Sequence, residues 1–240
     1  MPREEARPIV SAVLPTGVLV ETLYRPDEER TLLCLYQDGE ISYGATHLAG
    51  IDRLIPYSPK NNLLTNGIVL FPSEPMEYGS EADLVEAIQQ YIHRYVDVSP
   101  LFEKLASYYV LLTWVYDAFS ELPYLRLRGD AGSGKTRFLM TVGSLCYKPI
   151  FASGASTVSP LFRILDAMRG TLIIDEGDFR ASDEKAEITK ILNNGNAEGF
   201  PVLRTEVNSR KEFAPAAYVV YGPKLVATRG FLYGDRKSVV

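Results

Sequence analysis

Eight residues near the middle of the chain have the types and spacing needed to hold a phosphate group. They follow the pattern G-x-x-x-x-G-K-T and are Gly129, Asp130, Ala131, Gly132, Ser133, Gly134, Lys135 and Thr136. Glycines let the backbone turn tightly, so that its N–H groups can approach phosphate oxygens. In this pattern Lys135 is expected to reach the β- and γ-phosphates, and Thr136 to bind Mg²⁺ through its hydroxyl. The motif therefore predicts a site for ATP with Mg²⁺.

A phosphate loop works only between a strand and a helix, and the flanking sequence predicts both. An apolar run at residues 122–127 is typical of a buried strand, and residues 137–146 are expected to form the helix. That helix would direct its positive N-terminal end at the same anion. A chance Gly/Ser turn is the alternative, but the order of strand, loop and helix argues against it.

A second acidic motif follows about 40 residues later, as a buried strand that ends in two acids. The sequence TLIIDE covers residues 171–176 and ends with Asp175 and Glu176. Ligands of open α/β sheets bind at the carboxyl ends of strands. Asp175 is therefore expected to hold Mg²⁺, largely through water, and Glu176 to polarise the water that attacks the γ-phosphate. The alternative is an ordinary acidic pair on the surface after a strand. The phosphate loop upstream is what makes this alternative the weaker interpretation.

A β-hairpin and a last strand complete the set of candidate functional elements. The hairpin is expected to run out over residues 199–207 and back over 213–221, with Arg204, Arg210 and Lys211 in its turn region. Basic side chains there suit contacts with a nucleic-acid backbone, although a solubilising tip is the alternative. The final strand, KLVAT, would lie between the two motif strands and direct Thr228 at the γ-phosphate or the attacking water. An ordinary polar strand end is the alternative for Thr228.

Composition is that of a globular chain without a general affinity for nucleic acid. The 240 residues are 46% hydrophobic and 23% charged, with a net charge of −5, so any nucleic-acid contact must be local. Cys34 and Cys146 lie far apart without metal-ligand spacing, which favours a reducing cytoplasm. The first residues lack the features of a signal peptide. The apolar stretch at residues 105–119 is too short to span a bilayer, so no membrane association is expected.

Patterning along the chain predicts three regions. Residues 1–78 are rich in proline and β-formers and are expected to form a small β-rich accessory region; His47 stands alone there and is interpreted as an ordinary polar residue. Residues 79–121 are expected to be a helical linker, with Ser80 and Ser99 as helix caps. Residues 122–240 alternate strand and helix, which predicts an α/β domain with a mainly parallel sheet.

The order of these parts resembles the AAA+-like superfamily III helicases, the replicative ATPases of phages, plasmids and other mobile elements. The resemblance covers about residues 122–236 and rests on GDAGSGKT, LIIDE, LNNGNAEGFPVLRTE and FAPAAYVVYGPKLVATR. It implies a three-layer α/β/α P-loop NTPase core of the AAA+/ASCE-like kind. It also implies a homo-oligomeric ring, such as a hexamer, with ATP at the subunit interface. The hairpin would line the ring channel and grip single-stranded DNA through Arg204, Arg210 or Lys211.

The sequence departs from that family in two places. The family's sensor strand usually ends in Thr-Asn, whereas this one ends in Thr228-Arg229, so Thr228 is expected to take the sensing role. The arginine finger usually lies beyond this strand, and Arg236 is the nearby candidate after Arg229. Because no further strand or helical lid precedes Val240, the core is expected to be truncated at its C-terminus. Three hypotheses stay open: a DNA helicase or translocase, an ATP-dependent DNA-binding switch or loader, and an inactive ATPase fragment.

Overall fold

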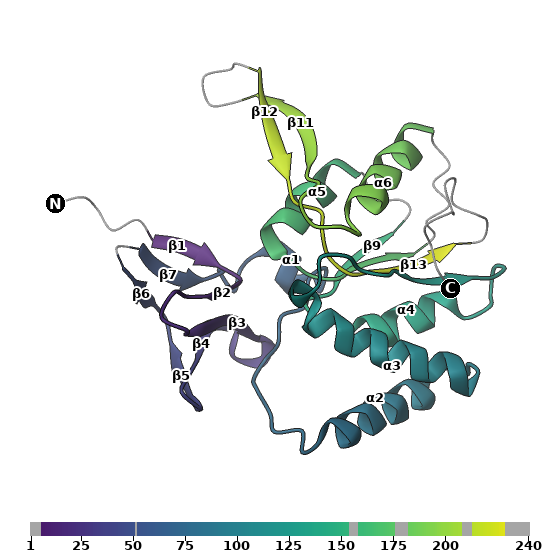
Figure 1. Ribbon diagram of the computed structural model, residues 1–240, viewed down its shortest axis with the longest axis horizontal. Coiled ribbons are helices and arrows are strands. Elements are labelled where there is room, and N and C mark those ends of the chain that lie inside the picture. The colour runs from purple at the N-terminus through teal and green to yellow at the C-terminus, as the bar shows by residue number, and fades with distance from the viewer. Residues whose placement is uncertain (1–5, 51, 154–157, 176–181, 208–212, 229–240) are drawn as a thin grey trace. The chain divides into compact units, whose positions relative to one another are not determined.

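The structure, a computed structural model, describes residues 6–50, 52–153, 158–175, 182–207 and 213–228 (Figure 1). The chain divides into two compact units, Met1–Glu77 and Tyr78–Val240. Within the described residues, none of the helices combines the length and apolar character that crossing a membrane requires.

The first unit is built mainly of strands in two sheets. A four-stranded sheet has the order β2-β3-β4-β5, and a three-stranded sheet has the order β1-β7-β6, in which β1 and β7 are parallel. The elements are β1 (Ala6–Ile9), β2 (Ser11–Val13), β3 (Leu19–Arg25), a 3₁₀ turn (Pro26–Glu28), β4 (Arg30–Gln37), β5 (Glu40–Gly44), β6 (His47–Ala49), β7 (Asp52–Pro56) and α1 (Asn62–Thr65).

The hairpin between β4 and β5 shows how local sequence determines a turn and the register of the strands that it joins. Asp38 and Gly39 separate the two strands and have φ angles of 52° and 88°. Positive φ at both central residues is typical of the two-residue turns that match strand twist. An Asp-Gly pair between two strand-forming runs indicates such a turn from the sequence, and the turn fixes the pairing of Gln37 with Glu40. Behind β3 and β4, a small core contains Val18, Val20, Leu33, Leu35 and Leu54.

The second unit contains all of the candidate functional elements. They are α2 (Glu81–Tyr95), α3 (Pro100–Trp114), a 3₁₀ turn (Tyr116–Ala118), β8 (Leu125–Arg128), α4 (Lys135–Gly143), β9 (Ile150–Ser153), α5 (Val158–Met168), β10 (Leu172–Asp175), α6 (Ser182–Asn194), β11 (Val202–Val207), β12 (Phe213–Tyr218) and β13 (Lys224–Thr228).

A four-stranded parallel sheet positions the two motifs in this unit. Its strand order is β8-β13-β10-β9. β13 pairs in parallel with both β8 and β10, so the last strand in sequence is central in the sheet. The prediction that this strand lies between the two motif strands is confirmed. The carboxyl ends of β8, β13 and β10 consequently meet at one edge, where ligands of such sheets bind.

Helices cover both faces of this sheet. Figure 1 shows α2, α3 and α4 on one side and α5 and α6 on the other. On the first side, a buried core joins these helices to the strands through residues such as Ile92, Val110, Phe138, Ile173 and Leu225. Because side chains of a strand alternate between faces, Ile174 and Val226 point to the opposite side, where they are also buried.

Local capping explains where the linker helices begin. The Ser80 side chain accepts a hydrogen bond from the Asp83 N–H, and the Asp83 carboxylate accepts one from the Ser80 N–H, which completes a capping box. The Ser99 side chain caps α3 by accepting a hydrogen bond from the Phe102 N–H, and a proline follows in the first turn. Both predicted caps are confirmed. α3 ends at Trp114, earlier than the apolar pattern suggested, because the chain tightens into a 3₁₀ turn there.

Lys224, at the start of β13, is fully buried, and it forms no ion pair with an acidic side chain among the described residues. Its ammonium donates hydrogen bonds to the backbone carbonyls of Gly195, Val220 and Gly222 at 2.8–3.1 Å. It also lies 4.9 Å from the centre of the Tyr124 ring. These acceptors join the end of α6 to the connection between β12 and β13. The buried ammonium therefore ties the base of the hairpin to the central strand.

Candidate nucleotide-binding site

The predicted phosphate loop forms a tight turn between β8 and α4. Gly132 and Gly134 have φ angles of 78° and 82°, in the left-handed region that glycine adopts without strain. Gly134 is the residue that precedes the first turn of α4. At Gly129 a Cβ atom would approach the Ser133 Oγ to 2.7 Å, so this position also requires glycine for space. The loop geometry therefore explains all three glycines of the motif.

Lys135 lies across this loop. Its Nζ donates to the carbonyl oxygens of Gly129 and Asp130 at 2.7 and 2.6 Å. A third, longer contact of 3.3 Å reaches the Ser133 hydroxyl. The ammonium thus bridges the two ends of the loop and places a positive charge inside it. Phosphate oxygens that enter the loop would compete with these carbonyls for the ammonium protons.

Thr136 and Asp175 join the two sequence motifs. The Thr136 hydroxyl, in the first turn of α4, donates to the Asp175 Oδ2 at 2.6 Å. Asp175 is the last residue of β10, at the carboxyl edge of the sheet. The residues are 39 positions apart in sequence, and only the parallel packing of β8, β13 and β10 brings them together.

A cavity of about 320 Å³ opens over this pair. Its lining consists of Ala131, Gly132, Ser133, Gly134, Lys135, Thr136, Asp175 and Thr228. Six of the eight predicted loop residues, all except Gly129 and Asp130, therefore line the same cavity as Asp175 and Thr228, which end their strands. The lining combines the backbone of the loop with the Lys135 ammonium, the Asp175 carboxylate, and the threonines at the start of α4 and the end of β13. This combination suits a phosphorylated ligand.

The donor set at Thr136 and Asp175 fits Mg²⁺. Magnesium prefers hydroxyl and carboxylate oxygens and usually keeps several waters while one or two protein groups and substrate phosphates hold it. Within the described part of the chain, no group of three His, Cys, Asp or Glu side chains could hold a metal ion by itself. The two adjacent oxygens therefore fit a metal that arrives with a nucleotide better than a permanent protein-only metal centre.

Thr228 lies at the end of β13 between the two motifs. Its side chain is fully buried and lines the cavity. Its hydroxyl accepts hydrogen bonds from the Arg126 Nε and Nη2 at 3.2 and 3.0 Å. The sequence analysis missed Arg126, although an arginine between two leucines, directly before a phosphate loop, was a usable signal. Arg126 now fixes the orientation of the Thr228 hydroxyl.

Several predicted functional residues lie outside the described residues. These are Glu176, Arg210, Lys211, Arg229 and Arg236. Their predicted roles stay predictions. Asp175, the residue before Glu176, is described and occupies the expected position.

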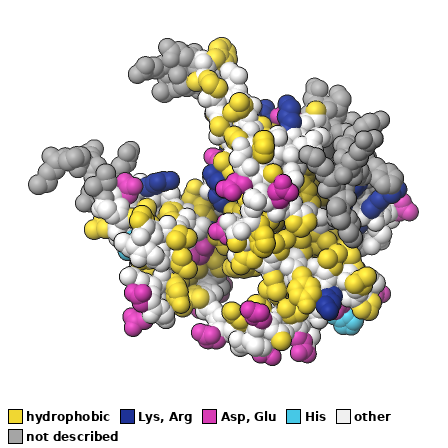
Figure 2. Space-filling view, in the orientation of Figure 1, with side chains coloured by type: hydrophobic (Ala, Val, Ile, Leu, Met, Phe, Trp, Pro, Cys, Tyr) yellow, Lys and Arg dark blue, Asp and Glu magenta, His cyan; other side chains and the backbone are white. Residues whose placement is uncertain are grey.

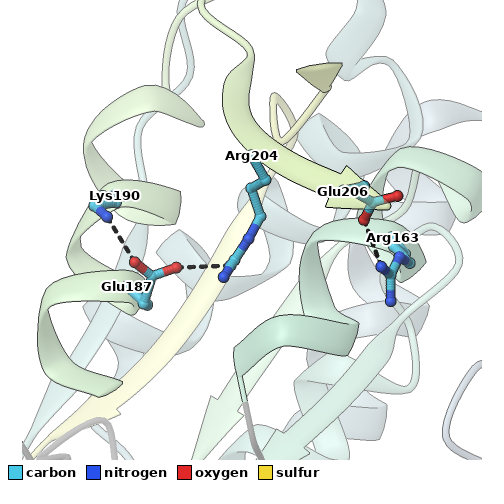
Figure 3. A network of polar contacts seen from close by, with 5 residues as sticks. All are labelled: Arg163, Glu187, Lys190, Arg204 and Glu206. Carbon is cyan, nitrogen blue, oxygen red and sulfur yellow. Dashed lines mark hydrogen bonds and ion pairs between the residues drawn. The ribbon is translucent and has the colours of Figure 1, made fainter. Parts of the chain in front are cut away.

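Arg204 requires a correction of position. The sequence placed it in the turn region of the hairpin, but it lies within β11, opposite Ala216 of β12. Its guanidinium donates to the Glu187 Oε2 of α6 at 2.7 Å, and Lys190 contacts the other oxygen of that carboxylate (Figure 3). The reason is the strand's two-residue period, which directs Arg204 towards the helices. A contact of Arg204 with DNA stays a prediction.

The sequence matches no protein-family model and no curated protein.

Proposed function

We propose that this protein is a Mg²⁺-dependent ATPase with a three-layer α/β/α P-loop NTPase core. The observation that carries the proposal is the contact between Thr136 and Asp175 at the mouth of the phosphate loop. It joins the end of a G-x-x-x-x-G-K-T loop to the acid of a buried strand, across a sheet in which β13 separates the two. Each motif alone is a weaker signal than their meeting at one cavity.

The chain's own residues divide the work of phosphate chemistry. Backbone N–H groups of the loop and the start of α4 would orient the phosphates, and Lys135 would neutralise their charge. Thr136 and Asp175 would hold Mg²⁺, which neutralises charge developing on the phosphate oxygens. Glu176 would hold and polarise the attacking water, and Thr228 would fix that water or the γ-phosphate. Such prepositioned charges supply most of the rate enhancement in phosphoryl transfer.

The proposed use of hydrolysis is movement along DNA. The β11–β12 hairpin stands beside α5 and α6, and Arg210 and Lys211 would supply its DNA contacts. We propose a helicase or translocase of the replication type that binds single-stranded DNA and works as a homo-oligomeric ring. Such a protein would act in the cytoplasm, where its two cysteines stay reduced.

A second candidate is an ATP-dependent DNA-binding switch or loader without processive unwinding. The ion pair of Arg204 with Glu187 favours it, because one of the three predicted DNA-binding cations is engaged with the protein itself. In that case nucleotide binding would order the protein for a partner or for DNA, and turnover would be slow.

The test is the steady-state rate of ATP hydrolysis with Mg²⁺, measured with and without single-stranded DNA over a range of protein concentration. A rate that rises with both DNA and protein concentration supports an interface-built motor. Tight ATP binding with slow turnover that DNA does not change supports the switch. Absence of ATP binding at millimolar nucleotide would reject both candidates.

Two substitutions separate binding from hydrolysis. Lys135→Ala should weaken ATP binding, because it removes the positive charge inside the loop. Glu176→Gln should keep ATP binding and abolish hydrolysis, because the amide cannot polarise the attacking water. Equal hydrolysis rates for wild type and Glu176→Gln would remove Glu176 from the mechanism.

A further inference from the structure

The β11–β12 hairpin has two chemically different faces. The strands pair antiparallel, and Leu203, Thr205, Phe213, Pro215 and Ala217 share the outward face. All of these described outward residues are exposed and none carries a charge; Phe213 is 81% exposed. Figure 2 shows apolar side chains along this projection. The described outward face is therefore poorly suited to bind phosphate groups.

The inward face carries the charges, and each of them is paired with a helix. Arg204 contacts Glu187 of α6, and Glu206 forms an ion pair with Arg163 of α5 (Figure 3). The two pairs have opposite polarity, since the hairpin supplies the cation in one and the anion in the other. At the base of β12, the Val219 N–H donates to an Asp166 carboxylate oxygen of α5 at 3.0 Å.

The Arg204 contact is more than a surface ion pair. Its guanidinium lies 4.7 Å from the centre of the Phe162 ring, and that ring is fully buried. Cation–π contact adds attraction to the ion pair and fixes the plane of the guanidinium. A hydrogen bond from Lys190, together with the charge of Arg204, lowers the pKa of Glu187 below its ordinary value, so the carboxylate stays charged.

An isolated two-stranded hairpin is at best marginally stable in water. The described β11 and β12 pair only with each other. Their position must therefore come from contacts with α5 and α6. On the inward side, Arg204, Glu206 and Val219 make those contacts with the two helices.

We propose that Arg204 is a positioning residue that holds β11 on α6 through Glu187 and does not itself contact nucleic acid. This role rests on the proposed function only in the oligonucleotide-binding experiment, because the hairpin is there assumed to bind DNA. The exchange experiment does not depend on DNA binding. Arg204 sets where the hairpin stands, and residues nearer the turn would make the contacts with DNA.

The first experiment measures amide hydrogen exchange of β11 and β12 in the full chain without nucleic acid. Arg204→Gln and Glu187→Gln should each accelerate exchange by about fivefold, as the loss of one favourable ion pair implies. The double variant should add little to either single change, because both remove the same contact. Arg204→Lys should restore part of the protection. Lys190→Gln is the matched control, since it removes a cation that pairs with the other oxygen of Glu187 from within α6.

The second experiment measures binding of a single-stranded oligonucleotide as a function of salt. Positioning predicts that Arg204→Gln and Glu187→Gln both weaken binding while the salt slope stays parallel to wild type. A phosphate contact predicts instead that Arg204→Gln lowers the slope by about one and that Glu187→Gln tightens binding. Unchanged exchange in both variants, or that second binding pattern, overturns the inference. If the wild type binds no oligonucleotide, the proposed DNA function fails and the exchange result alone decides the role of Arg204.

Discussion

At the scale of single residues, the site depends on hydroxyl groups that are held by charged neighbours. The Thr136 hydroxyl donates to Asp175, and the Thr228 hydroxyl accepts from Arg126. A threonine at each position supplies an oxygen to the cavity, while its charged neighbour fixes where that oxygen lies. We therefore expect the proposed chemistry of the site to be sensitive to the loss of a single oxygen atom.

Replacing Thr228 with valine tests this dependence with little change of volume. Thr228→Val removes the acceptor of two Arg126 N–H groups and should lower the free energy of unfolding by about 1.5–3 kcal/mol, the range for hydrogen bonds to charged groups. ATP turnover should fall more than ATP affinity, because the hydroxyl is proposed to act on the γ-phosphate or the water. Urea unfolding and kinetics measure the two effects. Thr228→Ser keeps the hydroxyl and is the control; equal unfolding of the valine and serine variants would show that the contact contributes nothing.

At the scale of elements, the close approach of α6 to the β12–β13 connection depends on Gly195. A Cβ atom there would lie 2.2 Å from the Lys224 Nζ and 2.5–2.6 Å from the carbonyl oxygens of Ile191 and Val220. Two of these neighbours are backbone atoms and cannot move aside. Gly195→Ala should therefore destabilise the protein by about 2–3 kcal/mol through overpacking.

Gly199 provides the comparison for that substitution. It has a φ angle of 87°, but no atom lies within 4 Å of its hypothetical Cβ. Gly199→Ala should cost only the backbone strain of about 1–2 kcal/mol. Denaturant midpoints of the two variants measure the difference. Gly195 is not among the glycines with positive φ, so a loss there no larger than at Gly199 would mean that the crowding around Lys224 costs less than predicted.

The buried Lys224 makes stability depend on pH. Burial lowers its pKa from 10.5 to about 7, although three carbonyl acceptors oppose that shift. Between these two values the unfolded chain binds a proton that the folded chain has released, so raising the pH favours folding. The slope contributed by this group cannot exceed ~1.4 kcal/mol per pH unit.

Urea unfolding at pH 7 and pH 9 measures this contribution as the difference between wild type and Lys224→Met. The wild type should gain stability relative to the variant as the pH rises. Burial also raises the pKa of Cys146 to about 12, which works in the opposite direction near pH 9 but is common to both proteins. Parallel pH profiles would show that Lys224 stays charged in the folded state.

Elements with strong local signals were predictable from sequence, and contacts between distant elements were not. The capping serines, the Asp38-Gly39 turn and the loop glycines each follow from backbone requirements of a few neighbouring residues. The pair of Arg126 with Thr228 spans 102 positions and depends on β13 inserting beside β8. The place of β13 could be predicted from resemblance, but which side chains it would meet could not.

In the β11–β12 hairpin, too, the contacts of a side chain with another element could not be predicted from the sequence. Its strands were predicted correctly in kind, yet Arg204 was assigned to the turn because charge alone suggested an exposed role. The two-residue period of β11 puts Arg204 on the same face as the buried Val202. Its partner on α6 is 17 positions away and carries no sequence signal of the pairing.

At the scale of the whole molecule, the two units differ in charge. Residues 1–77 contain six Lys and Arg residues against eleven Asp and Glu residues, while the remainder of the chain contains nineteen of each. The net charge of −5 therefore belongs to the first unit. An acidic unit repels a phosphate backbone, so DNA contacts are expected only in the second unit.

Limited proteolysis tests whether the second unit contains the complete nucleotide site. Residues 73–79 join the units without helix or strand and are exposed. Among the described residues, a glutamate-specific protease should cut first after Glu77, and chymotrypsin after Tyr78, because extended exposed backbone fits a protease best. Glu74 should resist the first enzyme, since a proline follows it.

The fragment that begins near Tyr78 should keep the ATP affinity of the full chain within about twofold, because every residue that lines the cavity belongs to it. Titration of the isolated fragment with a fluorescent ATP analogue measures this affinity, and the uncut chain is the control. Lys135→Ala, cut in the same way, gives the background for binding outside the loop. If the fragment stays folded but loses ATP, residues of the first unit must contribute to the site. In that case the accessory region would be part of the nucleotide-binding machinery.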